Sequence, residues 1–111
     1  ASEISASRLA LLETVDRFWD KTDRGEEISF EERAIGRRTQ ISAAWRAVRA
    51  MDEVFARAGG AAVHLKTPMQ RFWRDAHVGL THAIHVPGMI YHSAALTQLG
   101  GEPQGAYRAM I

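Results

Sequence analysis

The longest uninterrupted pattern in the sequence runs from Ser29 to Ala58 and predicts a single long helix. Ser29 followed by Glu32 forms a capping box at its start, and Gly59 with Gly60 ends it. Its apolar face is interrupted at one position, which either Met51 or Asp52 occupies. The other residues of this face are Ala34, Ile41, Trp45, Val48 and Phe55. About 28 residues rising about 1.5 Å each make a helix of about 42 Å, which is long for so short a chain. Such a helix needs other long helices against its apolar face.

A second amphipathic helix is predicted from Glu3 to Arg24, where Gly25 breaks the pattern. Its apolar residues recur at three- and four-residue spacings and share one stripe. They are Ile4, Leu11, Leu12, Val15, Phe18 and Trp19. The acidic residues between the two helices fit a solvated turn and helix start. They are Glu26, Glu27, Glu31 and Glu32.

Two shorter helices are predicted after the glycine pair. Thr67 and Pro68 are an N-cap followed by proline at the first helical position, so a third helix starts there. It is expected to end near His85, because Val86 precedes Pro87 and is pushed out of the helical region. A fourth helix spans residues 89–99, where two glycines stop it, and residues 102–111 are expected to be irregular.

The predicted fold class is all-α, because no segment shows sustained period-two alternation. No repeat or linker divides the chain, so we expect one domain over residues 1–111, an antiparallel helical bundle. The net charge of +1 argues against a nucleic-acid partner, and no apolar run approaches the roughly 18 residues of a membrane span. The absence of cysteine excludes disulfides and thiolate metal sites, and the cytoplasm is the default compartment.

All five histidines lie between residues 64 and 92. At about 100° per residue, one side of the third helix collects Met69, Phe72, Trp73, Ala76, Leu80, Ala83 and Ile84. The other side carries Arg74, His77, Thr81 and His85, with Arg71 and His82 next to them. This places the histidines on the face turned away from the core. The three tryptophans, Trp19, Trp45 and Trp73, lie on the apolar sides of their helices and are expected to pack in the core.

Three interpretations fit the histidine face. The first is solvated surface on which histidine and arginine are tolerated. The second is a metal site, although the chain has no HExxH motif and Asp75 is the one nearby carboxylate. The third is a site for an anionic or aromatic ligand, such as a phosphate or an isoalloxazine ring. Composition does not decide among them, but His85 at a helix C-terminus is chemically the most interesting of the five.

The segment "GGAAVHLKTPMQRFWRDAHVGLTHAIHVPG" resembles the C-terminal helical domain of the acyl-CoA dehydrogenase fold, in the branch of flavin-dependent aromatic monooxygenases. That branch includes the oxygenase components of 4-hydroxyphenylacetate hydroxylase and secosteroid phenol hydroxylase, and dibenzothiophene monooxygenase. The resemblance is strongest from Gly59 to Pro87, where a Gly-Gly turn, a Pro-x-Gln-Arg helix start, Arg-Asp and paired histidines before proline occur in order. Residues 7–58 fit the preceding long helices more loosely.

The resemblance implies a bundle that forms a homo-oligomer, expected to be a tetramer, and shares a flavin site between neighbouring domains and subunits. A histidine in the segment matching "THAIHVP" is implicated in the reaction of flavin with oxygen, and His85 is the first candidate, with His82 second. Arg71, Gly59 and Gly60, with Arg74, are implied to lie near the flavin or the subunit contact. A separate flavin reductase supplies reduced flavin, FMN or FAD, and oxygen is transferred to a small phenolic or related aromatic substrate.

Two departures from the family leave alternatives open. Acyl-CoA dehydrogenases carry a Tyr-Glu-Gly-Thr type motif near their last helices, and this chain has none there. The family's N-terminal helical domain, its β-domain and the first helix of its C-terminal bundle also have no counterpart in these residues. The chain is therefore interpreted as the C-terminal part of a longer flavoenzyme that is inactive alone. The alternatives are a non-catalytic helical oligomerisation module and the C-terminal domain of an acyl-CoA dehydrogenase.

Overall fold

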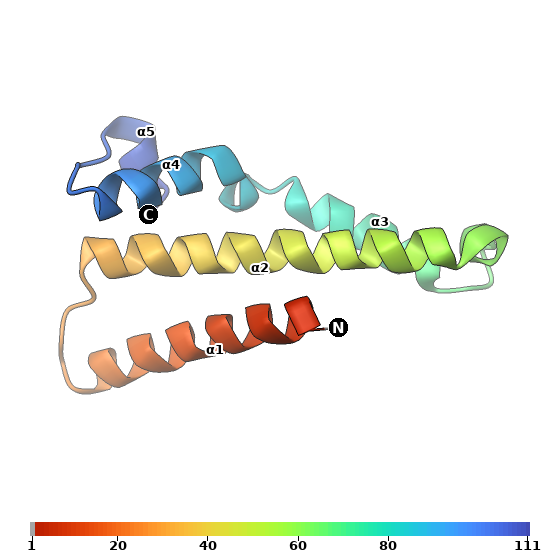
Figure 1. Ribbon diagram of the computed structural model, residues 1–111, viewed down its shortest axis with the longest axis horizontal. Coiled ribbons are helices and arrows are strands. Elements are labelled where there is room, and N and C mark those ends of the chain that lie inside the picture. The colour runs from red at the N-terminus through yellow and green to blue at the C-terminus, as the bar shows by residue number, and fades with distance from the viewer. Residues whose placement is uncertain (1) are drawn as a thin grey trace.

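The computed structural model describes residues 2–111, and that part of the chain contains helices and no strand (Figure 1). The α-helices are α1 (Ser2–Asp23), α2 (Phe30–Arg57), α3 (Met69–Leu80), α4 (Pro87–Gln98) and α5 (Gly105–Ala109). Two 3₁₀ turns, η1 (Gly59–Val63) and η2 (Ala83–His85), lie between them. The all-α prediction is confirmed.

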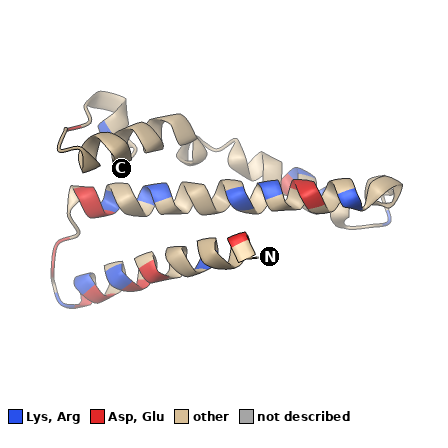
Figure 2. Ribbon diagram, viewed as in Figure 1, with Lys and Arg blue, Asp and Glu red and all other residues tan. Residues whose placement is uncertain are grey.

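Helix α2 is the spine of an elongated molecule that measures 50 × 30 × 20 Å. Figure 1 shows α1 running antiparallel along one side of α2, while α3 and α4 follow one another along the opposite side. The predicted antiparallel bundle is therefore confirmed, with α2 as a central helix that packs against α1, α3 and α4. Helix α5 packs mainly on α4 and also reaches α2, where the Arg108 guanidinium lies 4.7 Å from the centroid of the Phe30 ring. Charged residues concentrate on α1 and α2, and α4 carries none (Figure 2).

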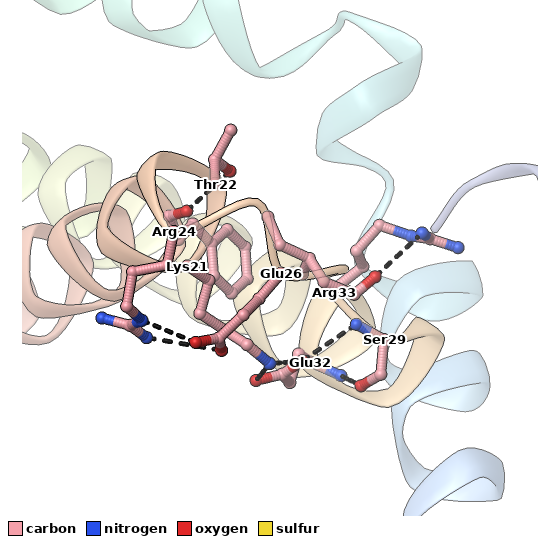
Figure 3. Close-up of polar contacts among 9 residues, drawn as sticks. Lys21, Thr22, Arg24, Glu26, Ser29, Glu32 and Arg33 are labelled. Atoms are coloured by element: carbon pink, nitrogen blue, oxygen red, sulfur yellow. Dashed lines mark hydrogen bonds and ion pairs between the residues drawn. The ribbon is translucent and has the colours of Figure 1, made fainter.

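The turn between α1 and α2 is held by ionic and capping contacts (Figure 3). The Ser29 hydroxyl accepts a hydrogen bond from the Glu32 N–H at 3.2 Å, and the Glu32 carboxylate accepts one from the Ser29 N–H at 2.9 Å. This is the predicted capping box. Lys21 at the end of α1 donates to both Glu32 oxygens at 2.8 Å. The Lys21 ammonium and then the Ser29 N–H lower the pKa of Glu32 to about 2, so this glutamate joins two helices and is not merely solvated.

The core is small and lies between α2 and α4. Ile41 and Ile90 are fully buried there, together with Ala34 and Ala94. Helix α1 has no buried residue, and Trp19, predicted to pack in the core, is 71% exposed. The prediction for Trp19 is wrong because only α2 packs against α1, so one flank of the α1 apolar stripe faces no other helix among residues 2–111.

Helix α1 does pack closely on α2 along its other flank. A Cβ placed on Gly36 of α2 would meet the Phe18 ring at 2.9 Å and the Thr14 methyl group at 3.3 Å. Glycine at this position therefore lets the two helix backbones approach. Leu11, Val15 and Phe18 line an open cleft beside Gly36, in which Val15 is still 53% exposed.

Three predicted boundaries differ from the structure. Thr67 does not cap α3, because its hydroxyl donates to the His64 carbonyl at 2.9 Å and Pro68 precedes the first helical residue. Helix α3 ends at Leu80 and does not reach His85. Residues 102–111, predicted to be irregular, include α5, whose Tyr107 carbonyl accepts a hydrogen bond from the buried Ser93 hydroxyl at 2.7 Å.

Candidate functional site

Residues 81–86 form a tight turn around η2 that carries two of the candidate histidines, His82 and His85, and is called the histidine turn below. The Thr81 hydroxyl donates to the Val78 carbonyl at 2.7 Å, within the last turn of α3. His82 then adopts an extended backbone, with φ −64° and ψ 139°, and its ring Nδ1 accepts the Ile84 N–H at 3.2 Å. The His82 ring thus caps η2, and the His85 N–H donates back to the His82 carbonyl at 2.9 Å. A local side-chain cap explains why the helix stops before His85.

The predicted histidine stripe on the outer face of α3 is consequently wrong. His85 no longer follows His77 around one helix, and both side chains are half-buried against other parts of the chain. Arg74 and Thr81 remain exposed, and so does His82. The physical reason is that a break in the helix rotates every later residue out of the assumed register.

Two side chains of α2 donate hydrogen bonds to backbone carbonyls of the histidine turn. The Trp45 indole N–H donates to the His85 carbonyl at 2.9 Å. The Arg37 guanidinium donates to the Ile84 carbonyl at 3.0 Å and to the Met110 carbonyl at 3.1 Å. The Trp45 prediction of a packed residue is confirmed in part, because its ring is half-buried while its N–H makes a specific bond.

The imidazole of His85 contains a buried nitrogen without a partner. Its Nδ1 is inaccessible to solvent and has no hydrogen-bond partner among residues 2–111. Leaving a buried polar atom unsatisfied costs about 1–3 kcal/mol. A side chain held in this way fits a site that is completed by a ligand or by a further part of the protein.

A second polar cluster joins α2 to α3. The Asp52 carboxylate accepts the Trp73 indole N–H at 2.7 Å and lies 3.1 Å from His77 Nε2. His77 Nδ1 lies 2.8 Å from the Trp73 carbonyl, and the His77 and Trp73 ring centroids are 4.2 Å apart. Both nitrogens of His77 thus face oxygen acceptors, and a neutral imidazole can donate to only one of them. Trp73 also packs on Phe55 at 5.1 Å, so its predicted packing role is confirmed.

The remaining predicted site residues lie on α3 and at the start of η1. Arg71 and Arg74 are exposed, and the Arg71 guanidinium lies 5.5 Å from the centroid of the neighbouring Phe72 ring. Gly59 has a φ of +57°, so it ends α2 in a left-handed conformation as predicted. The 14 positions between Trp45 and Gly59 correspond to about 20 Å of helix. The structure brings His82 and His85 together and leaves Gly59 and Gly60 well away from them.

A cleft elsewhere in the described residues does not contain these candidates. It has a volume of about 500 Å³ and lies between α1, α2 and α4. Its lining consists of Ala6, Ser7, Ala10, Arg38, Thr39, Ser42, Ala43, Arg46 and Tyr91. The turn at residues 81–86 instead has apolar side chains at the surface, where Ile84 and Val86 are 39% and 41% exposed. It can supply one wall of a site and needs another body to close it.

Neither a metal cluster nor a membrane span is visible in residues 2–111. No group of three or more histidine, aspartate or glutamate side chains gathers at metal-binding distances there. No helix in that part of the chain is both long and apolar enough to cross a bilayer. The metal interpretation of the histidine face therefore has no geometric support.

Comparison with known proteins decides the family. The sequence profile described as "Acyl-CoA dehydrogenase, C-terminal domain" matches residues 1–87. This chain belongs to the acyl-CoA dehydrogenase C-terminal domain family. The match spans α1, α2, α3 and the histidine turn, which are the elements that build the candidate site.

Individual relatives of this family member are hydroxylases and monooxygenases. The chain is 56% identical over 110 residues to a pigment production hydroxylase of Rhodococcus erythropolis, covering 99% of this chain and 28% of that protein. It is 40% identical over 91 residues to the flavin-dependent monooxygenase oxygenase subunit HsaA of Mycobacterium tuberculosis, covering 82% of this chain and 23% of HsaA. The crystal structure of the M. tuberculosis HsaA monooxygenase is similar with a TM-score of 0.88 at 36% identity, over 94% of this chain and 27% of that one.

The chain therefore spans about a quarter of the length of the curated relatives that it matches. Sequence reasoning singled out His82 and His85 but missed the polar roles of Arg37, Asp52 and Trp45. Asp52 is a charged residue on the otherwise apolar face of α2, and this break in the pattern could have indicated its polar role. No sequence signal pointed to Arg37, because its partners are backbone carbonyls far along the chain.

Proposed function

We propose that this chain is the C-terminal domain of a longer, reduced-flavin-dependent monooxygenase that hydroxylates a phenolic or related aromatic substrate. The observation that carries the proposal is the 56% identity, over nearly the whole chain, to a hydroxylase. The 40% identity to an oxygenase subunit described as flavin-dependent supports the cofactor. Under this proposal residues 1–111 are one helical-bundle domain whose activity depends on the rest of the enzyme.

The residues of the histidine turn fit one wall of a flavin site. The buried Nδ1 of His85 lacks a partner, and apolar side chains of Ile84 and Val86 are partly exposed beside it. A bound reduced flavin, FMN or FAD, would supply the reaction with oxygen. We propose that His85 holds a hydrogen bond or a proton at the reacting part of the ring, with His82 as the second candidate.

The proposed cofactor contacts extend to four further residues. Arg71 and Arg74 present exposed guanidinium groups that could bind a phosphate of FMN or FAD. Gly59 and Gly60 offer backbone without side chains, with nothing within 4 Å of a Cβ at either position. Because Gly59 and Gly60 lie in η1, beyond the end of α2 and well away from His85, we propose that they and the two arginines of α3 contact a flavin held with a neighbouring subunit.

The proposed partners follow from the same relatives. A separate reductase supplies the reduced flavin, and the protein assembles as a homo-oligomer, which we expect to be a tetramer. The exposed apolar flank of α1, with Val15 and Trp19, supports assembly because a helix face of this kind is normally covered. We also propose a cytoplasmic location, which agrees with the absence of cysteine.

The test uses the full-length enzyme with reduced flavin, oxygen and a panel of phenols. His85→Ala should lower the ratio of hydroxylated product to oxygen consumed and raise peroxide release, because flavin oxidation loses its protein partner. The melting temperature should change little, since His85 is only half-buried. His64→Ala is the matched control, because the His64 side chain is exposed and outside the turn.

An unchanged ratio of product to oxygen consumed in His85→Ala would refute the role proposed for His85. If the wild-type enzyme yields no hydroxylated product but reduces an electron acceptor with an acyl-CoA, the dehydrogenase alternative holds. If neither reaction occurs, the domain serves as an oligomerisation module.

A further inference from the structure

We propose that Trp45 and Arg37 are positioning residues that fix the histidine turn, residues 81–86, relative to α2. Each side chain donates to a backbone carbonyl of η2, so each can act on His85 through the backbone of the turn. The significance of this role for catalysis rests on the function proposed above. The position of the turn, which two α2 side chains set through hydrogen bonds, does not depend on that function.

The two contacts end on consecutive carbonyls. Trp45 donates to the His85 carbonyl at 2.9 Å, and Arg37 donates to the Ile84 carbonyl at 3.0 Å. The last carbonyls of a helical turn have no partner within the turn, so a donor from elsewhere must satisfy them. Trp45 and Arg37 stand about two turns apart on one rigid helix, and the turn is thus fixed at two points.

Two anchor points restrict rotation as well as translation of the segment. A single bond to the Ile84 carbonyl would leave the turn free to pivot, and the His85 ring would swing with it. The buried Nδ1 of His85 remains in place only if the backbone does not pivot. Since a displacement of about 1 Å in a reacting group can cost about 100-fold in rate, restricting this motion matters for a histidine that works on a cofactor.

Arg37 also connects the turn to the C-terminal segment. Its Nε donates to the Met110 carbonyl at 3.1 Å, and a further guanidinium nitrogen donates to Gln40 on the same helix. The planar guanidinium spans three acceptors in fixed directions, whereas a lysine ammonium at this position offers a compact point charge on a flexible stem. Arg37→Lys should therefore keep the charge and lose the bridge between the turn and residues 105–111.

The decisive variant is Trp45→Phe in the full-length enzyme, with Trp73→Phe as its matched control. Each change removes one indole N–H that bonds across to another helix or turn, at 2.9 Å in Trp45 and 2.7 Å in Trp73. Only Trp45 is bonded to the histidine turn. Trp73→Phe should lose at least as much thermal stability as Trp45→Phe, because the Trp73 indole bonds to a charged carboxylate and the Trp45 indole to a neutral carbonyl. A change in the turn that appears only in Trp45→Phe is therefore a positioning effect and not general weakening.

The first readout is hydrogen–deuterium exchange in residues 81–86 of the enzyme without flavin. The His85 and Val86 N–H groups donate within the turn and report its opening. Trp45→Phe should speed their exchange roughly fivefold, the factor that corresponds to a hydrogen bond of about 1 kcal/mol. Trp73→Phe should leave it unchanged. Equal exchange in Trp45→Phe and wild type would overturn the proposal whether or not the enzyme is a monooxygenase.

The second readout is the coupling of oxygen use to product. Trp45→Phe and Arg37→Lys should each lower it several-fold, and Trp73→Phe should not. In a His85→Ala background, Trp45→Phe should lower coupling no further, because a positioning residue acts only through the residue that it positions. Additive losses would overturn the assignment. A wild-type enzyme that makes no hydroxylated product refutes the proposed function and leaves the exchange result to decide on the geometry.

Discussion

Replacing Asp52 by alanine tests whether the polar cluster between α2 and α3 stabilises the fold. The substitution removes the acceptor of the Trp73 indole and the partner of His77, at 2.7 and 3.1 Å. A hydrogen bond to a charged group contributes about 1.5–3 kcal/mol, and the lower value applies because the Asp52 side chain is 46% exposed. The His77 contact adds at most about 0.5 kcal/mol after solvent screening. Alanine recovers about 0.6 kcal/mol through its higher helix propensity.

The expected net loss is about 1.5 kcal/mol in the free energy of unfolding. Urea denaturation followed by far-ultraviolet circular dichroism measures it directly. Glu53→Ala is the control, because this neighbouring acid makes only an exposed pair with Arg57 at 3.5 Å and should change stability by less than about 0.5 kcal/mol. If Asp52→Ala is no more destabilising than Glu53→Ala, the cluster does not stabilise the contact between α2 and α3, and the reasoning fails.

Two further changes test the ends of α1 and α2. The pKa of Glu32 is lowered to about 2 by Lys21 and Ser29, so its contribution is complete above pH 4.5 and is lost as pH falls toward 2. Glu32→Gln should therefore lower stability at pH 7, and the difference from wild type should vanish near pH 2 in urea unfolding; a pH-independent difference would contradict this. Gly59→Ala should lower stability by about 1–2 kcal/mol because φ is +57°, while Gly60→Ala, which has no positive φ, should be close to neutral in the same assay. Equal effects of the two glycine changes would refute the strain argument.

The two long helices could be predicted from local signals. The capping box at Ser29 and the glycines after Ala58 set the ends of α2, and Gly25 ends the α1 pattern. These signals work because caps and left-handed glycines satisfy backbone groups within a few residues. The same reasoning gave an all-α bundle, which the structure confirms.

The end of α3 could not be read from periodicity. Apolar residues continue at helical spacing to Ile84, yet His82 leaves the helix and caps η2 with its own ring. The surroundings of His85 changed as a result, from an outer face to a half-buried turn. Histidine as an N-cap is not one of the residues that a sequence pattern normally flags.

Helix α5 also depended on contacts far along the chain. Its five residues are too few to form a stable helix alone, and the Ser93 hydroxyl and the Arg37 guanidinium hold its Tyr107 and Met110 carbonyls. Nothing within residues 102–111 signals these partners.

The sequence by itself determined which segments are helical, where α1 and α2 end, and that the second half of the chain carries the unusual chemistry. Those properties depend on side chains within one or two turns of each other. Only the tertiary structure decided that Arg37 and Trp45 donate hydrogen bonds to the Ile84 and His85 carbonyls, respectively, and that the Trp19 side chain is exposed. Such contacts join residues about 40 positions apart, and their formation depends on which elements pack together rather than on any local pattern.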